Sequence, residues 1–249
     1  MEGGPTIEIG GERLPIRPNL ATAIEAAWGR LAGAGTWWTG SERLAIAAEV
    51  RRARSCELCE RRKSAVSPSA IAGRHVATGL LSVDAVEAAH RLATDASRLT
   101  AATIQALTDG SLGEEHYVEL VAVVAMITAL DSFDAGLGRP LRELPEPVGG
   151  RPSRLRPAQA VRSLAWVATV QPGAYTESEF DPYKAHGDKN IHQALSLVPA
   201  EVASFFDLDV ELYLRDHEIR DFSREFRAIT HRQIELIAGR TSALNRCFY

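Results

Sequence analysis

The chain is poor in cysteine, in alternating strand patterns and in long apolar runs. Its 249 residues contain three cysteines, too few for the disulfide framework of a small secreted domain. It has no N-terminal signal-like run and no apolar stretch long enough to span a bilayer. A formal net charge of −4 argues against bulk nucleic-acid binding. We therefore expect a cytoplasmic protein that binds neither membrane nor nucleic acid, with thiols that are reduced, redox-active or metal-bound.

Hydrophobic residues make up 45% of the chain, enough for a real core in one large domain or two small ones. Arginine is far commoner than lysine and alanine is abundant, which is typical of a GC-rich, bacterial coding sequence.

Helical periodicity dominates and predicts an all-α protein. Asn19 is expected to cap a helix that runs to about Ala32. A second helix is expected from Thr39 to about Lys63, because its apolar residues recur at helical spacing. Further helices are predicted at 82–92, 100–108, 114–137, from about 190, at 199–214 and from 230 onward.

Glycine and proline divide this pattern. Residues 1–18 read as an irregular arm, and 19–138 as a first helical unit. Residues 139–189 are rich in proline and glycine and read as a connector. Residues 190–249 are expected to form a second helical unit that stops early.

Two segments share one architecture. Thr39-Gly40-Ser41-Glu42 is a capping box, and Cys56 follows Thr39 by seventeen residues. Thr230-His231-Arg232-Gln233 is again a capping box, and Cys247 follows Thr230 at the same spacing. The offset of 191 residues also aligns Ile46 with Ile237 and Ala47 with Ala238. We interpret the pair as two copies of a helix that delivers a dithiol, the second interrupted after Cys247-Phe248-Tyr249.

Cys56 and Cys59 form a CxxC pair that helical geometry places on one face, together with Glu49 and Lys63. Such a pair can close a disulfide. Surrounding arginines favour the reactive thiolate over the thiol, and Glu49 is a candidate to accept the proton, directly or through water.

Other readings of these residues stay open. A buried cysteine is often a small apolar residue of the core. Zinc is disfavoured, because a second CxxC and a histidine pair at finger spacing are both absent. The basic run 51–63 is interleaved with glutamates and reads as a solvated helix face rather than a phosphate site. His186 and His192, before the second unit, either line a site or have no role.

At Cys56-Glu57-Leu58-Cys59, and at Thr230–Leu236 leading to Ala243–Tyr249, the chain resembles the alkylhydroperoxidase D-like, or carboxymuconolactone decarboxylase-like, superfamily. It looks most like the tandem, peroxidase-related branch. The segments Glu115–Val121, Asp131–Leu137, Ser67-Pro68 and Leu197–Pro199 add to the likeness, which covers most of residues 37–249. The resemblance implies a helical fold in tandem and thiol-dependent reduction of hydroperoxides.

The resemblance also implies residue roles. The family pattern is a glutamate twelve residues before a CxxC and a histidine four residues after it. Glu235 and Cys247 match the relay glutamate and the first, resolving thiol. In the first unit, Leu44 and Lys63 occupy the glutamate and histidine positions, so Glu49 or a histidine from elsewhere must substitute. His75 and His116 are the candidates for that proton relay.

Some relatives carry selenocysteine as the second member of this motif. We therefore expect selenocysteine directly after Tyr249, encoded by a UGA codon read as a stop. An ordinary truncation, a frameshift or deliberate trimming of the chain would leave the same end. The DNA beyond the Tyr249 codon distinguishes these explanations. No other cofactor and no metal is expected.

The sequence thus predicts a thiol- or selenol-dependent peroxidase or dithiol oxidoreductase. In the cycle that the resemblance implies, the second-position thiolate or selenolate attacks the peroxide and the first-position cysteine resolves it. The expected partners are a hydroperoxide, an external dithiol or disulfide reductant, and further copies of the chain in a homo-oligomer. Because only Cys56 and Cys59 form a complete pair, we expect weak or no activity from this chain. Two alternatives are a non-redox carboxymuconolactone decarboxylase-like enzyme and a non-catalytic helical scaffold.

Overall fold

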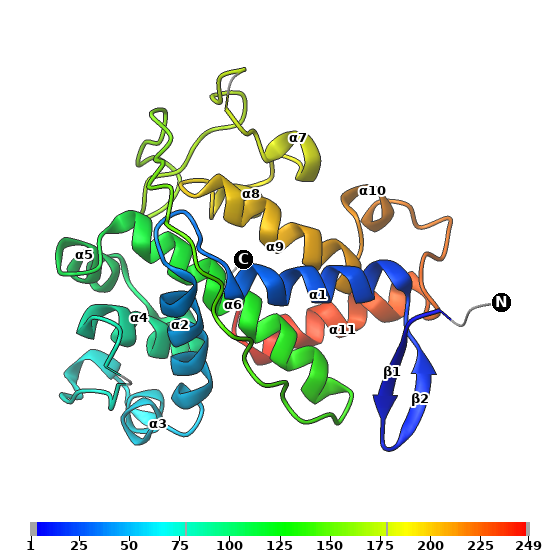
Figure 1. Ribbon diagram of the computed structural model, residues 1–249, viewed down its shortest axis with the longest axis horizontal. Helices are drawn as coiled ribbons and strands as arrows, with labels where there is room; N and C mark the ends of the chain where they lie inside the picture. Colours follow the sequence, from blue (N-terminus) through cyan, green and yellow to red (C-terminus); the bar gives the residue numbers. More distant parts are fainter. Residues whose placement is uncertain (1–3, 78, 178, 248–249) are drawn as a thin grey trace.

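The computed structural model describes residues 4–77, 79–177 and 179–247. Within these ranges it holds eleven α-helices and one two-stranded sheet (Figure 1), which confirms the expected all-α fold. The helices are α1 (Pro18–Ala32), α2 (Gly40–Ala53), α3 (Glu57–Ser64), α4 (Val83–Asp95), α5 (Ala101–Asp109), α6 (Glu114–Gly136), α7 (Tyr183–His186), α8 (Asn190–Gln193), α9 (Pro199–Leu212), α10 (Asp216–Ile219) and α11 (His231–Leu244). Two short 3₁₀ turns lie at Pro68–Ala70 and Ala96–Arg98.

The N-terminal segment is more regular than the irregular arm expected for residues 1–18. Strands β1 (Thr6–Ile9) and β2 (Glu12–Pro15) pair antiparallel as a hairpin that projects from the start of α1 (Figure 1). Gly10 and Gly11 connect them, with φ of +58° and +86°. Glycine adopts positive φ without steric cost, and a two-residue hairpin turn needs it at both positions.

Two helix boundaries differ from the sequence expectation. Helix α1 begins at Pro18, with Arg17 rather than Asn19 in the cap position, because proline has no N–H to satisfy and suits the first helical turn. The helix expected from Thr39 to about Lys63 is two helices. Cys56 has extended dihedrals (φ −81°, ψ 117°), and the Ser55 hydroxyl donates to the Arg52 carbonyl, which competes with regular helix continuation.

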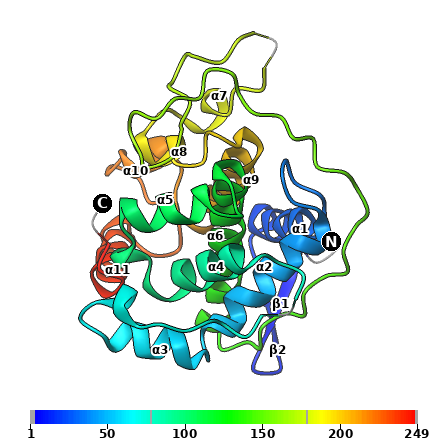
Figure 2. The same cartoon turned by 90° about the vertical axis from the view of Figure 1, so that its left-hand side faces the viewer.

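The core lies where α2 packs against α4 and α6, and where α1 packs against α9 (Figures 1 and 2). These faces bring together fully buried aliphatic side chains: Ile24, Leu31, Ile46, Leu120, Ile127, Leu130, Leu197 and Leu208. Helix α9, from the segment expected to form the second unit, therefore shares one apolar cluster with α1 and α6. The proposed division at 138 and 190 stays a prediction.

A buried ion cluster ties three of these helices together. The guanidinium of Arg43 on α2 donates to Glu119 on α6 and to Glu201 on α9, each at 2.6 Å. Glu119 also accepts from the Trp37 backbone N–H. Burial opposes the charged form of Arg43, but the two carboxylates outweigh it and raise its pKa. One guanidinium bridges carboxylates from two other helices, so the cluster links α2, α6 and α9.

The segment between α6 and α7 runs over the outside of the helices (Figure 2). Its described residues include one isolated β-bridge, between Val161 and Thr169, and the Val148 and Arg154 N–H groups donate to the Ala32 and Thr36 carbonyls. None of the helices in the described ranges combines the length and the apolar character needed to cross a membrane.

Candidate functional site

The two cysteines of the CxxC motif lie at the start of α3. Cys56 occupies the cap position and Cys59 lies in the first turn. Both thiols are free, and the two sulfur atoms are 3.7 Å apart. Cys56 is partly exposed, whereas Cys59 is 4% exposed. A thiol at a helix N-terminus is stabilised as thiolate by the unpaired backbone N–H groups there.

Two histidines from different parts of the chain meet these sulfurs. The Nδ1 atom of His75 lies 3.3 Å from the Cys56 sulfur and 3.9 Å from the Cys59 sulfur. The Nδ1 atom of His90 lies 3.3 Å from the Cys59 sulfur. The two rings also lie against each other, with centroids 4.0 Å apart. Each thiol therefore has an imidazole nitrogen within hydrogen-bond distance.

Each imidazole has a carboxylate on its opposite nitrogen. His90 Nε2 lies 3.0 Å from Glu49 Oε2, in a pair whose side chains are almost completely buried. His75 Nε2 lies 3.1 Å from Glu87 Oε2. Glu87 in turn accepts two hydrogen bonds from one guanidinium nitrogen of Arg62, at 2.7 and 2.8 Å. The carboxylates orient both rings so that Nδ1 faces the sulfurs.

His75 lies in a loop of irregular backbone, and two arginine side chains hold this loop in place. The Arg62 guanidinium donates to the Ile71 carbonyl, and Arg52 donates to the Val76 carbonyl at 2.9 Å. Gly73 has φ of +154°, and a Cβ there would lie 2.9 Å from a Leu58 methyl carbon. Glycine at this position lets the loop approach the CxxC turn closely.

These contacts shift the pKa values of the charged groups. Burial opposes the ionised form of Cys56, but hydrogen bonds from the Cys59 backbone and from His75 outweigh it, so its pKa is lowered. Burial likewise opposes the charged form of His75, but its contacts with Cys59, Glu87 and Cys56 raise its pKa to about 10. Burial lowers the pKa of His90 despite its bond to Glu49. The site thus holds a charged imidazole beside one thiol and a neutral imidazole beside the other.

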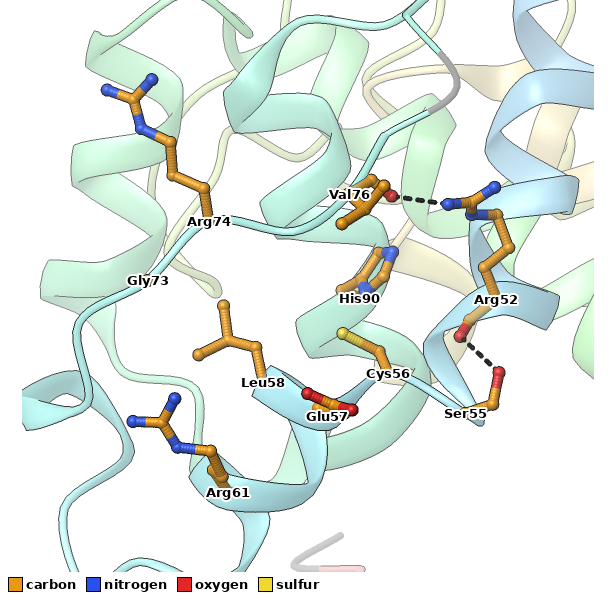
Figure 3. A pocket seen from close by; sticks show the side chains of 10 residues that line it. All are labelled: Arg52, Ser55, Cys56, Glu57, Leu58, Arg61, Gly73, Arg74, Val76 and His90. Carbon is orange, nitrogen blue, oxygen red and sulfur yellow. Dashed lines mark hydrogen bonds between the residues drawn. The ribbon is translucent and has the colours of Figure 1, made fainter.

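Two cavities reach the cysteine pair. One, of about 600 Å³, is lined by Cys56, His90 and the loop from Gly73 to Val76. Figure 3 shows Cys56 and His90 directed toward each other inside it, with Arg61 and Arg74 on the side away from Arg52. The other, of about 490 Å³, is lined by both cysteines and by Ala93 and Thr94 of α4. Cys56 therefore borders both cavities.

The structure brings together four of the residues selected from the sequence: Cys56, Cys59, Glu49 and His75. Glu49 does not reach the thiols along a shared helix face, because α2 ends before Cys56; it contacts His90 instead. Lys63, expected on that face, is exposed. Leu44, at the family's glutamate position, is part of the core.

His116 lies apart from this cluster. Its ring packs on Trp37 and Trp38, and its Nε2 is 2.6 Å from the guanidinium of Arg154. His186 and His192, whose role the sequence left open, both pack on the ring of Phe206.

Glu235 and Cys247 do not join the cluster either. The Glu235 carboxylate accepts a hydrogen bond of 2.6 Å from the Tyr213 hydroxyl. Cys247 is exposed just beyond α11. The remaining residues of the interrupted motif, Phe248 and Tyr249, lie outside the described residues.

Sequence reasoning missed His90 and Glu87, and it counted Arg62 only among the arginines around the thiols. His90 had a detectable signal: it lies on the apolar face of the predicted 82–92 helix, beside Val86 and Ala89. A histidine there needs a buried partner. Glu87 and Arg62 resemble ordinary charges of a solvated helix face, and their sequence context carries no comparable signal.

Comparisons of the chain with protein-family models, with curated proteins and with solved structures gave no match.

Proposed function

We propose that the protein is a dithiol oxidoreductase that reduces hydroperoxides with Cys56 and Cys59. The observation that carries the proposal is the placement of two free sulfurs 3.7 Å apart, each within 3.3 Å of an imidazole nitrogen. Two thiols at this distance reach disulfide bonding distance by side-chain rotation. An imidazole at each thiol supplies the proton transfers that peroxide reduction needs.

Cys56 is the attacking thiol in this proposal. It is the more exposed of the pair and borders both cavities. Its thiolate is stabilised at the start of α3, and the thiolate is the nucleophilic species. The family resemblance implies attack by the second cysteine of the motif, but here Cys59 is 4% exposed and suits the resolving role.

The proposed cycle has two steps that oxidise the cysteines and a third that reduces them again. The Cys56 thiolate attacks the peroxide O–O bond and becomes a sulfenic acid, while the leaving alkoxide takes a proton from His75 and departs as alcohol. The Cys59 sulfur then displaces hydroxide from the sulfenic acid and forms the disulfide. Its proton passes to Nδ1 of His90 and from there to the leaving hydroxide, which departs as water. An external dithiol reduces the disulfide by thiol–disulfide exchange and becomes a disulfide itself.

The buried carboxylates set the direction of these proton transfers. Glu49 accepts from Nε2 of His90, which leaves Nδ1 free to take the Cys59 proton and stabilises the imidazolium that forms. This arrangement supports the expectation that Glu49 or a histidine from elsewhere substitutes for the residues absent at the Leu44 and Lys63 positions.

A thiol count with the Cys247→Ser variant tests the proposal. In this background Cys56 and Cys59 are the remaining cysteines. The protein is reduced, treated with a chelator and given one equivalent of cumene hydroperoxide. We expect loss of both thiols, an intact mass lower by two hydrogen atoms, and one equivalent of cumyl alcohol. Survival of both thiols, with no alcohol formed, would refute the function.

Single cysteine variants separate the two roles. In Cys59→Ser, the sulfenic acid on Cys56 has no partner and should be trapped by dimedone. In Cys56→Ser, we expect much slower trapping at Cys59, because it is buried. Faster trapping at Cys59 would reverse the roles but leave the function standing.

The same assay addresses the alternatives raised from the sequence. A decarboxylase-like enzyme would retain its activity when both cysteines are serine. A scaffold would neither consume peroxide nor lose thiols.

A further inference from the structure

The CxxC cluster also has the composition and dimensions of a metal site. Cys56, Cys59, His75 and His90 each offer one donor atom, and the four atoms all lie within 4.8 Å of one another. The sequence argument against zinc considered a second CxxC or a closely spaced histidine pair. The fold instead supplies histidines 16 and 31 residues beyond Cys59.

The distances among the donors fit a tetrahedron around one ion. Zinc binds thiolate sulfur at about 2.3 Å and imidazole nitrogen at about 2.0–2.1 Å, and ideal tetrahedral angles then place two sulfurs about 3.8 Å apart and sulfur and nitrogen about 3.5 Å apart. The two sulfurs here are 3.7 Å apart. The sulfur–nitrogen distances are 3.3, 3.3 and 3.9 Å. The sulfur–sulfur distance and these three sulfur–nitrogen distances are thus close to the tetrahedral values, and all four donor atoms lie within 4.8 Å of one another.

The outer contacts are those of a metal-binding histidine pair. In protein metal sites, a ligating imidazole usually donates its second N–H to a carboxylate, which fixes the tautomer and the ring orientation. His90 has Glu49 at 3.0 Å, and His75 has Glu87 at 3.1 Å. Both rings therefore present Nδ1 to the centre.

The donor set selects the metal. Two thiolates and two imidazoles favour zinc over magnesium, calcium or manganese, which prefer oxygen ligands. Two thiolates also balance the charge of a divalent ion. The four ligands come from α3, from the loop after it and from α4, so an ion would link three segments that the chain otherwise connects by hydrogen bonds.

We propose that Cys56, Cys59, His75 and His90 bind one Zn²⁺ ion in a tetrahedral site. The inference does not depend on the proposed function, because binding needs the four donors and no redox step. The zinc-bound state and the disulfide state exclude each other, since a sulfur that ligates zinc is not free to form the disulfide. Peroxide reduction therefore belongs to the metal-free protein, and zinc would inhibit it.

Metal binding is tested on the tag-free, reduced chain after removal of metals with a chelator. Titration with Co²⁺ should give visible d–d bands and a near-ultraviolet thiolate charge-transfer band that saturate at one ion per chain. Zn²⁺ should abolish both. Absence of these bands, or saturation without thiolate charge transfer, would overturn the proposal.

Variants identify the ligands. Cys59→Ser, His75→Ala and His90→Ala should each lose stoichiometric binding and the tetrahedral spectrum. Glu49→Gln preserves the shape of the side chain and all four ligands, and it should weaken the affinity for the metal by about 10–100-fold. Cys247→Ser and His217→Ala, at exposed positions, should bind as the wild type does. Circular dichroism of each metal-free variant shows whether it is folded. Unchanged binding by both folded histidine variants would contradict the assignment.

The two proposals fail separately. A chain that binds Co²⁺ as described but keeps its thiols under peroxide when metal-free has a zinc site and no peroxidase function. A chain that forms the disulfide under peroxide but shows no cobalt spectrum has the peroxidase function and no zinc site.

Discussion

Thr39 and Thr230 each begin a helix of 14 residues with a capping box, and each helix is followed by a cysteine at the same spacing. In both boxes the threonine hydroxyl accepts the backbone N–H three residues later, and the Glu42 or Gln233 side chain accepts from the threonine N–H. The local hydrogen bonding of the two segments is thus nearly the same.

Their burial is opposite. Ile46 on α2 is completely buried, whereas Ile237, at the same position of α11, is 58% exposed. Leu236 and Leu244 of α11 are exposed as well. These apolar side chains agree with the expected homo-oligomer, which stays a prediction.

The difference shows that a capping box and a cysteine at a fixed spacing do not by themselves create a reactive site. Both segments form the helix and place a cysteine after it, because these features depend on nearby residues. A site at Cys56 additionally needs α4 and the His75 loop, which pack against α2 and α3. Cys247 is exposed, and a thiol gains a perturbed reactivity from its surroundings rather than from its place in a motif.

The largest expected effect concerns the two carboxylates assigned from the sequence. Glu49→Gln removes the acceptor that orients His90 and should slow peroxide-driven disulfide formation by about 100-fold or more, the usual range for a lost proton relay. Glu235→Gln, which alters a partly buried contact with Tyr213 outside the cysteine cluster, should leave the rate unchanged. Stopped-flow oxidation of metal-free protein at pH 7.5 measures both. Equal rates for wild type and Glu49→Gln would remove the relay from the mechanism.

The matched isoleucines test the packing difference directly. Ile46→Ala leaves a cavity in the core and should lower the free energy of unfolding by about 2–5 kcal/mol. Ile237→Ala changes an exposed side chain and should stay within about 0.5 kcal/mol. Urea unfolding followed by circular dichroism gives both values. A comparable loss at Ile237 would mean that α11 is buried in solution, for instance between two copies of the chain.

The pH dependence of stability can be examined on α9, whose end contacts α11 through Tyr213 and Glu235. Burial raises the pKa of Asp209 to about 6, whereas an unfolded carboxyl titrates near 4. The folded state therefore binds more protons between these values, and this residue destabilises the fold progressively as pH rises from about 4 to 6. Asp209→Asn should raise stability at pH 7.5 by up to about 3 kcal/mol and have little effect at pH 4. Denaturant unfolding at both pH values tests this; a gain of equal size at pH 4 would exclude the titration of Asp209 as its cause.

The smallest effect concerns the caps themselves. Thr39→Ala should cost about 1 kcal/mol of global stability, since it removes a cap from a helix in the core. Thr230→Ala should fray α11 and change global stability less, because α11 buries little. Hydrogen exchange resolved by helix, together with urea unfolding, separates the two outcomes. Equal global losses would indicate that both helices belong to one cooperative unit.

Much of the fold could be predicted because its signals are local. The helices expected at 82–92 and 100–108 correspond to α4 and α5, and the long apolar helix expected from residue 114 to 137 is α6. The break between α2 and α3 was missed because the residues around Cys56 keep helical periodicity, whereas Cys56 itself is extended. The hairpin at residues 6–15 was missed because each strand is four residues long, so the alternation of β1 covers too few residues to stand out.

The candidate site was predicted only in part. Cys56, Cys59 and Glu49 could be found because they lie within eleven positions of one another. His75 could be named but not distinguished from His116, since a single histidine has no local pattern that separates a site from a packing position. His90 and Glu87 enter from another helix, and their role appears only once α4 lies against α2 and α3.

The sequence by itself determined most of the helices, the capping boxes at Thr39 and Thr230 and the close spacing of the two thiols, because each of these depends on groups a few residues apart. Tertiary structure decided which cysteines lie beside the two histidines. Two histidines and two carboxylates converge on Cys56 and Cys59 because apolar faces of separate helices bury against one another and carry those side chains with them.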